Sequence, residues 1–93
     1  MAISILIPSP MRRFTEDNDT LEFASASTVE DVLVQLQTLY PDTKRPLRDD
    51  NNNIRRSVNI YVNDEDIRFL QGKDTPLKDG DNISIVPAIA GGV

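Results

Sequence analysis

The C-terminal residues Ala90-Gly91-Gly92-Val93 have the types and spacing best suited to chemistry in this 93-residue chain. Glycine lacks a Cβ, so a Gly-Gly segment is thin enough to enter another protein's active site and adopts angles that other residues avoid. A chain end also has few contacts to lose when it leaves its own domain. These are the properties of a carboxylate that a separate enzyme activates. The alternative is a frayed chain end that happens to contain two glycines.

The chain contains no cysteine and no histidine. Disulfides, thiol nucleophiles, iron–sulfur clusters and cysteine-ligated zinc are therefore excluded, and the commonest general base and transition-metal ligand is absent. Ser25, Ser27 and Ser57 have no histidine to activate them, and a serine without a base is a poor nucleophile. We therefore predict that the chain is not an enzyme and binds no metal or cofactor itself.

The formal charge is −5, from 15 acidic and 10 basic residues. Because phosphate binding rests on Lys and Arg, this balance argues against nucleic acid or an anionic membrane as the main partner. The apolar run from Ile3 to Ile7 is too short for a secretion signal and follows no basic residue. No stretch approaches the roughly 20 residues that span a bilayer. We expect one cytoplasmic domain.

A few strands and one helix must position the tail. The run Ile3-Ser4-Ile5-Leu6-Ile7 alternates and ends at Pro8, which predicts a strand with its isoleucines on one face. Residues 8–19 and 42–57 are predicted loops, the first with Phe14 turned inward and the second long enough to contain one turn. Further strands are predicted at residues 20–24, 58–62, 67–69 and 82–86, with turns at 63–66 and at the Asp-Gly pair within 77–81.

The helix is predicted to begin with a capping box, in which Ser27 caps the first turn and Glu30 returns a bond to the Ser27 backbone. Pro41 ends the helix. Between them, apolar residues recur at helical spacing and form one stripe: Val29, Val32, Leu33, Leu36, Leu39 and Tyr40. One main helix on one face of a mixed sheet of four to five strands is an α+β domain. We expect this domain over residues 1–86 and a flexible tail over residues 87–93.

The uncovered face of the sheet is expected to carry a docking patch. If the isoleucines of the first and last strands face the helix, Leu6 and Val86 point to the opposite face together with Tyr61. Three apolar side chains on the open face of a small sheet form a candidate partner-binding surface. Scattered apolar surface is also normal in a monomer, which is the alternative explanation.

Three motifs stand out in the last third of the chain: Val58-Asn59-Ile60-Tyr61-Val62-Asn63-Asp64-Glu65-Asp66-Ile67-Arg68-Phe69, Leu77-Lys78-Asp79-Gly80-Asp81 and Ile85-Val86-Pro87-Ala88-Ile89-Ala90-Gly91-Gly92. Through these motifs the chain resembles the MoaD/ThiS family of ubiquitin-like β-grasp sulfur carriers, densely over its last third and more loosely before it. Within that family it is most like the members that deliver sulfide for cysteine biosynthesis. The resemblance implies a β-grasp fold.

The resemblance further implies that the chain is a protein co-substrate. A partner adenylyltransferase resembling the ubiquitin-activating enzymes would use ATP to adenylate the carboxylate of Gly92, and a sulfur donor would then leave a thiocarboxylate there. A sulfur-acceptor enzyme such as a cysteine synthase would receive the sulfur, and a peptidase would release the product. Gly91 would keep the tail slim. The residues expected to contact partners are Leu6, Tyr61, Val86, Pro87, Ile89 and Ala90.

Val93 departs from the family pattern, because many carriers end at Gly-Gly. We infer a precursor whose last residue is trimmed by a peptidase, so that Gly92 becomes the working terminus. The alternatives are that Val93 is a remnant of cloning or that the chain is a relative that carries no sulfur.

Three classes of function stay open. A sulfur carrier comes first, with cysteine biosynthesis ahead of a molybdopterin synthase small subunit of the MoaD type and of a thiamine-type carrier. A ubiquitin-like modifier that forms isopeptide bonds to lysines needs the same glycine terminus, so only its products differ. A non-covalent interaction domain would work without Gly91 and Gly92.

Charged segments offer weaker candidate sites. Asp49 begins a run that imitates a calcium loop, but Ile54 stands where such a loop needs glycine and Ile60 where it needs glutamate, so we predict a solvated loop. Residues 64–66 could bind a cation or a basic partner, or simply favour a turn. The arginines that could contact acidic partners, or else be ordinary surface charges, are Arg12, Arg13, Arg55 and Arg56.

Overall fold

Five strands form one mixed sheet in the order β2-β1-β5-β3-β4, and one main helix packs on one of its faces. The structure is a computed structural model that describes residues 2–87. The predicted α+β architecture is confirmed. The elements are β1 (Ile3–Leu6), β2 (Thr20–Phe23), α1 (Val29–Leu39), α2 (Lys44–Leu47), β3 (Val58–Val62), β4 (Glu65–Asp66) and β5 (Asn82–Pro87), with 3₁₀ helices at Ser9–Phe14, Pro41–Thr43, Ile67–Phe69 and Gly72–Asp74.

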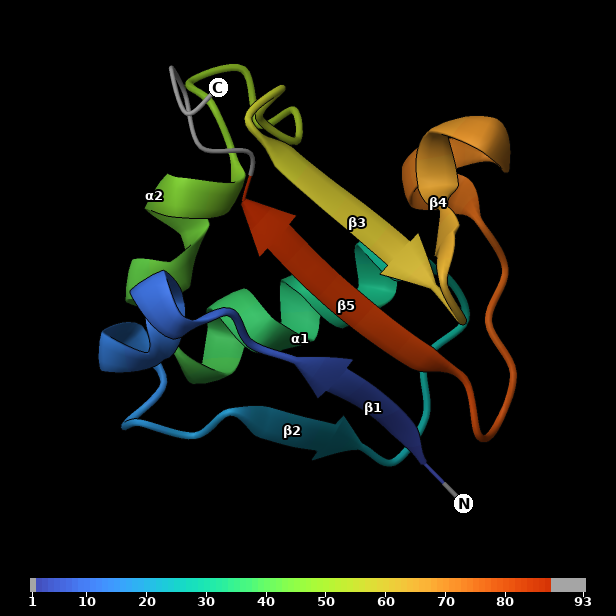
Figure 1. Cartoon of the computed structure of the whole chain (residues 1–93), viewed down its shortest axis with the longest axis horizontal. Coiled ribbons are helices and arrows are strands. Elements are labelled where there is room, and N and C mark those ends of the chain that lie inside the picture. The colour runs from blue at the N-terminus through green and yellow to red at the C-terminus, as the bar shows by residue number, and fades with distance from the viewer. Residues whose placement is uncertain (1, 88–93) are drawn as a thin grey trace.

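The central pair of strands, β1 and β5, runs parallel, whereas β2 pairs with β1, and β3 with both β5 and β4, in antiparallel fashion. The carboxyl ends of β1 and β5 therefore lie at the same end of the sheet, beside the start of β3. Figure 1 shows α2 and the 9–14 helix gathered at that end, close to where β5 finishes. The turns before β4 and before β5 lie at the opposite end.

The core lies between the sheet and α1, and strand alternation fills it from the sheet side. Ile3, Ile5 and Ile7 are buried, as predicted, and pack with buried residues of β3 and β5. Fully burying a branched aliphatic side chain is worth roughly 1.5–3 kcal/mol. The helix contributes Val29, Val32, Leu33 and Leu36, none of which is exposed to solvent.

The apolar stripe of α1 is shorter than predicted. Leu39 is 57% exposed and Tyr40 lies beyond the end of the helix, where it is half-buried. Leu39 borders a shallow surface cavity with Phe23 of β2. Because β2 is the edge strand, no further strand covers that last turn.

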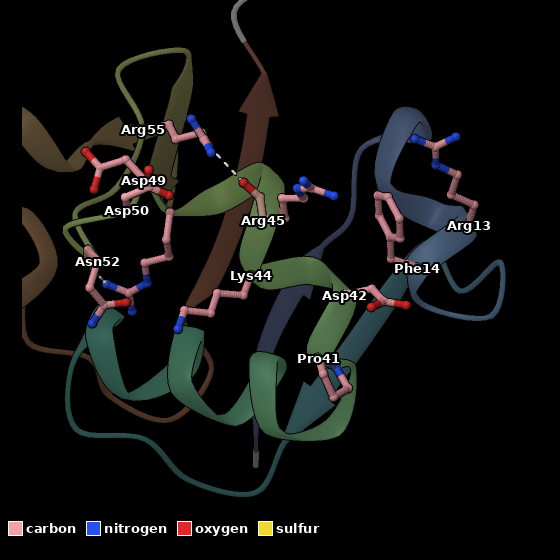
Figure 2. A pocket seen from close by; sticks show the side chains of 11 residues that line it. Arg13, Phe14, Pro41, Asp42, Lys44, Arg45, Asp49, Asp50, Asn52 and Arg55 are labelled. Atoms are coloured by element: carbon pink, nitrogen blue, oxygen red, sulfur yellow. Dashed lines mark hydrogen bonds between the residues drawn. The ribbon is translucent and has the colours of Figure 1, made fainter.

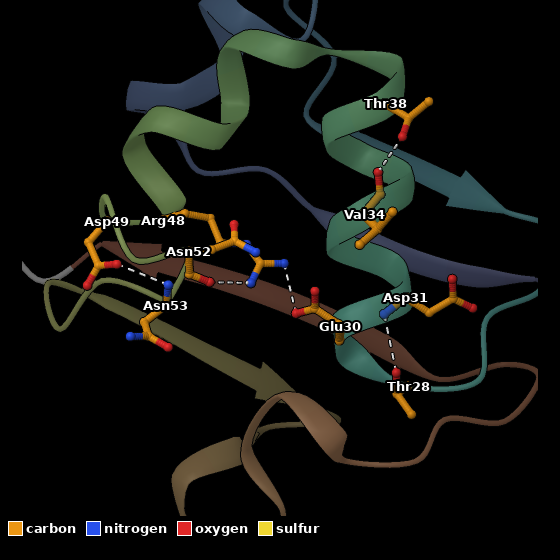
Figure 3. Close-up of polar contacts among 9 residues, drawn as sticks. All are labelled: Thr28, Glu30, Asp31, Val34, Thr38, Arg48, Asp49, Asn52 and Asn53. Carbon is orange, nitrogen blue, oxygen red and sulfur yellow. Dashed lines mark hydrogen bonds and ion pairs between the residues drawn. The ribbon is translucent and has the colours of Figure 1, made fainter.

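The cap of α1 differs from the predicted Ser27–Glu30 box by one residue. Thr28 is the N-cap: its hydroxyl accepts a 3.2 Å hydrogen bond from the backbone N–H of Asp31, while the Asp31 carboxylate accepts a 3.0 Å bond from the Ser27 N–H. The capping geometry is therefore reciprocal but uses Thr28 and Asp31 (Figure 3). Glu30 is left free to pair elsewhere.

The long segment over residues 42–57 contains, besides the one turn that was predicted and forms α2, an ion pair between a buried arginine and a half-buried glutamate. Arg48 is only 3% exposed, and its guanidinium donates to the Glu30 carboxylate at 2.8 Å and to the Asn52 carbonyl at 3.0 Å. Leu47 beside it is fully buried. Figure 3 shows Arg48 reaching from the end of α2 to α1, so this segment is fastened to the helix layer.

Two other predicted segments are corrected. Residues 8–19, predicted as a loop, contain the 9–14 helix with Met11 buried, and Phe14 packs half-buried against the core. Residues 67–69, predicted as a strand, form a 3₁₀ helix because the Asp66 carboxylate caps the Arg68 N–H. The turn predicted at residues 63–66 is shorter than expected, because Glu65 and Asp66 form β4 and pair with β3. The two residues between β3 and β4, Asn63 and Asp64, have φ of 50° and 73°, which suits a type I′ turn.

Removing the charge of Glu30 is expected to destabilise the fold. Glu30→Gln keeps the side-chain size but leaves the buried Arg48 guanidinium without its anion, so the free energy of unfolding should fall by about 1–3 kcal/mol. Urea unfolding measures this change. Glu22→Gln, at an exposed position on β2, is the matched control and should stay within about 0.5 kcal/mol of wild type. Equal losses from the two substitutions would contradict a stabilising role for the ion pair.

Candidate functional site

The sheet brings Leu6, Tyr61 and Val86 together on the face away from α1. Leu6 of β1 and Tyr61 of β3 both pair with Ser84 of β5, and Val86 lies two residues further along β5 on the same face. Leu6 is 47% exposed and Val86 43% exposed, while Tyr61 is half-buried. The predicted orientation of these side chains is confirmed, and we call the three residues the outer-face patch. Their role in binding a partner stays a prediction.

A polar network that sequence reasoning missed borders this patch. The Arg68 guanidinium donates to the Asp66 carboxylate at 2.8 Å and to the Asn59 side-chain oxygen at 2.8 Å. Asp66 pairs with Tyr61, and Asn59 pairs with Val86, across the sheet. The network therefore lies next to the apolar side chains and gives them a charged rim. The available signal was the spacing Asp66-x-Arg68, which is typical of an Asx cap.

The Arg68–Asp66 contact shifts the titration of both groups. Hydrogen bonds from the Arg68 side chain and backbone hold the pKa of the Asp66 carboxyl below its ordinary value. The same hydrogen bond, helped by the Asp66 charge, raises the pKa of the Arg68 guanidinium. Both shifts favour the ionised form of the pair.

Phe69 is a second feature that strand phasing did not single out. It is 87% exposed, the highest value among the large hydrophobic residues of the described chain, and the neighbouring Leu70 is 39% exposed. The error in assigning residues 67–69 to a strand concealed this exposure, because alternation does not apply to a 3₁₀ turn. An aromatic side chain in water next to Arg68 adds to the apolar surface that a partner can cover.

Strand β5 is held at both ends, and this determines where the tail leaves the domain. At its start, the buried Asp81 carboxylate accepts hydrogen bonds from the Asn63 side chain at 2.9 Å and the Lys78 N–H at 2.9 Å. Burial alone would raise the pKa of Asp81, but these bonds and the Lys78 charge outweigh it and lower the pKa. At its end, half-buried Pro87 pairs with Val58.

The predicted chemical end of the chain lies outside the described residues. It comprises the remaining expected partner contacts, Ile89 and Ala90, and the Gly91-Gly92 pair. The predicted boundary between domain and tail at residues 86 and 87 falls within the last two residues of β5. The described residues therefore stop before Gly91 and Gly92, the residues predicted to take part in the chemistry.

The segment that imitates a calcium loop in the sequence has a structural role. The Asp49 carboxylate accepts the backbone N–H groups of Asn51 and Asn53, at 2.9 and 3.0 Å, and so caps its own turn. Over residues 2–87, no group of three or more acidic side chains is arranged to hold a metal ion. Over the same residues, no helix has both the length and the apolarity required to cross a membrane.

Comparison with known proteins connects these features to a family. The profile of the ThiS family matches residues 5–92. The sulfur carrier protein CysO of Mycobacterium tuberculosis is 38% identical over 94 residues, covering 99% of this chain and 100% of the relative. The chain belongs to the ThiS family. The resemblance predicted from the sequence is confirmed.

Solved structures of ThiS-like proteins confirm the ubiquitin-like β-grasp fold. A chain from the crystal structure of the Amycolatopsis orientalis BexX/CysO complex superposes with a TM-score of 0.88 at 33% identity, covering 97% of this chain and 99% of that chain. Small archaeal modifier protein 1 of Methanosarcina acetivorans superposes with a TM-score of 0.86 at 29% identity, covering 97% and 95%. The family fold is therefore shared by proteins named as carriers and proteins named as modifiers.

Replacing Arg68 is expected to change the acid response of the outer face. In Arg68→Gln the pKa of Asp66 should rise toward the ordinary value of about 3.9. In the wild type, the lowered folded pKa means that Asp66 contributes stability above its unfolded pKa and loses it as the pH falls through its folded pKa. The variant should lose less stability over that acid range. NMR titration of the Asp66 carboxyl, with unfolding measured at each pH, tests this, and an unchanged pKa would contradict it.

Proposed function

We propose that this chain is a sulfur carrier of the CysO type, whose glycine carboxylate at Gly92 is converted to a thiocarboxylate that supplies sulfur for cysteine biosynthesis. The observation that carries the proposal is that the ThiS profile continues to residue 92 and so includes both glycines. Full-length similarity to CysO supports the choice of acceptor pathway. The chain acts as a co-substrate rather than as a catalyst.

The proposed chemistry needs a partner because the chain has no cysteine or histidine to perform it. A carboxylate is a poor electrophile. In the first step, the Gly92 carboxylate attacks the α-phosphorus of ATP in the active site of an adenylyltransferase, and pyrophosphate leaves. In the second step, a sulfide equivalent attacks the acyl carbon, AMP leaves with the bonding electrons, and a thiocarboxylate forms. Cations that stabilise the phosphates come from the partner.

The outer-face patch is proposed as the surface on which the adenylyltransferase docks. It lies on β5 and its two neighbours, so a partner that covers Val86 also stands beside the exit of the tail at Pro87. Ile89 and Ala90 would then lie in the channel leading to the active site. The BexX/CysO complex of A. orientalis supports the idea that a carrier of this fold forms a complex with another protein.

The C-terminus must be processed before sulfur is loaded, and the sulfur must then be delivered to an acceptor. As long as Val93 follows Gly92, the glycine carbonyl belongs to a peptide bond and has no free carboxylate to adenylate. We therefore propose that a peptidase removes Val93. A cysteine synthase is the proposed sulfur acceptor, a peptidase releases the product, and the cytoplasm is the proposed location.

A ubiquitin-like modifier is the second candidate function, and the similarity to an archaeal modifier of 29% identity favours it. A glycyl adenylate can be attacked by a lysine amine as well as by sulfide, so the same tail serves both chemistries. A small subunit of molybdopterin synthase is a further option within the carrier class. The products separate these functions: an isopeptide to lysine survives reductant, whereas a thiocarboxylate is consumed by its acceptor.

Loading with sulfur is expected only after Val93 is removed. The chain ending at Gly92 is incubated with its adenylyltransferase, ATP and sulfide, and intact mass spectrometry detects exchange of one oxygen for sulfur. The full-length chain should show no exchange, because its glycine carbonyl is an amide. Equal loading of both chains, or loading of neither, would contradict the proposed role of Gly92.

A charge within the outer-face patch is expected to weaken docking without unfolding the domain. Val86→Asp should raise the KM for the carrier in adenylation by roughly tenfold, since an uncompensated carboxylate is buried under the partner. Val34→Asp is the matched control: Val34 is 46% exposed on α1, close to the 43% of Val86, but lies in the other layer. The control should leave KM unchanged. The same KM for both variants, with circular dichroism showing both folded, would rule out the outer face as the docking surface.

A further inference from the structure

A cavity of ≈ 440 Å³ opens at the point where the tail leaves the domain, and Pro87 forms part of its lining. We call it the tail-root pocket. Its apolar lining includes Met11 and Phe14 of the 9–14 helix and Pro46 of α2. Its charged lining residues are all basic: Arg13, Arg45 and Arg55. Cationic side chains around an apolar floor form a site for an anionic group attached to an apolar one.

Over residues 2–87, the salt bridges join Glu30 to Arg48, Asp66 to Arg68 and Asp81 to Lys78. Arg13, Arg45 and Arg55 take part in none of these three salt bridges. An anion placed among the three arginines would therefore be attracted by positive charges that no salt bridge within the described residues neutralises.

Two of the three arginine side chains, those of Arg55 and Arg13, also make contacts within the domain. The Arg55 guanidinium donates from Nε to the Arg45 carbonyl at 2.8 Å, and the Arg13 guanidinium lies 4.8 Å from the centroid of the Phe14 ring. Figure 2 shows these side chains in the adjoining cavity of ≈ 810 Å³, with the Arg55–Arg45 bond dashed. Asp42, Asp49 and Asp50 line that larger cavity but not the tail-root pocket.

The positive charge of the tail-root pocket differs from the charge of the chain as a whole. The chain carries a net charge of −5, yet three of its arginines line one pocket at the end of the sheet where β5 finishes. At the opposite end, Asp64 lies in the turn before β4, Glu65 in β4 and Asp79 in the turn before β5. A partner approaching the tail therefore meets local positive charge on an acidic protein, which orients the encounter.

We propose that the tail-root pocket docks an acidic segment of the adenylyltransferase, one that places Asp or Glu side chains among the arginines and an apolar side chain against Met11 and Phe14. This inference rests on the proposed function, because it assumes that the tail enters an adenylating active site. A partner that encloses the tail must stand over its root, so the pocket and the outer-face patch would be covered together. The acidic segment would determine the direction in which the tail enters.

The test compares Arg45→Glu with Lys73→Glu in ATP–pyrophosphate exchange catalysed by the adenylyltransferase, using chains that end at Gly92. Both substitutions reverse one exposed charge, but Lys73 does not line the tail-root pocket. Arg45→Glu should raise the KM for the carrier by roughly five- to tenfold at low salt, with kcat little changed, and the difference should shrink at high salt. Lys73→Glu should behave as the wild type.

The possible outcomes separate this inference from the proposed function. If the wild-type chain is adenylated and Arg45→Glu and Lys73→Glu give equal KM values at all salt concentrations, the inference about the tail-root pocket is wrong and the proposed function stands. If the wild-type chain is not adenylated, the inference and the proposed function are both wrong. A lower KM in Arg45→Glu would indicate that the pocket binds the chain's own C-terminal residues. If Arg45→Glu instead changes the oligomeric state of the chain in the absence of the adenylyltransferase, the pocket binds a second copy of the chain. Either result overturns the inference.

Discussion

The parallel pairing of β1 with β5 at the centre of the sheet is the constraint on which the rest of the structure depends. It places the carboxyl ends of both strands at one end of the domain, together with the start of β3. The last strand of the described residues is thus the middle strand of the sheet, paired on both sides. A tail that follows such a strand leaves the domain from a rigid point.

This arrangement separates stability from chemistry. The described domain holds a buried aliphatic core, a capped helix and a buried Arg48–Glu30 ion pair, and none of these has a reactive group. The reactive group in the proposed function is a backbone carboxylate, which any domain could carry. The domain would contribute recognition: the outer-face patch on one side of β5 and the tail-root pocket at its end.

Sequence patterns predicted the features that depend on regular alternation and missed those that depend on single long-range contacts. The alternation of Ile3, Ile5 and Ile7 predicted a strand and its buried face. The same alternation along the strands predicted that Leu6 and Val86 are exposed. In contrast, Arg48 could not be distinguished in the sequence from an exposed charge in a loop, because Glu30 lies beside it only in the folded domain.

The same limit explains the errors in the short elements. Ser27 and Thr28 are both good caps, and the choice between them was made by tertiary contacts: the Ser27 carbonyl accepts the Leu77 N–H, and Thr28 bridges to Pro76. The tail-root pocket had a sequence signal, since Arg13 and Arg55 were noted as candidates. Its third arginine, Arg45, lies in a segment without periodicity, so the cluster became visible only in three dimensions.

The most direct test of the central claim is the intact mass of the endogenous protein, purified without reductant from the organism that makes it. We expect a chain that ends at Gly92 and a fraction in which sulfur replaces one oxygen of the terminal carboxylate. A chain that always retains Val93 and never gains sulfur would contradict the claim that Gly92 is the chemical end of a sulfur carrier.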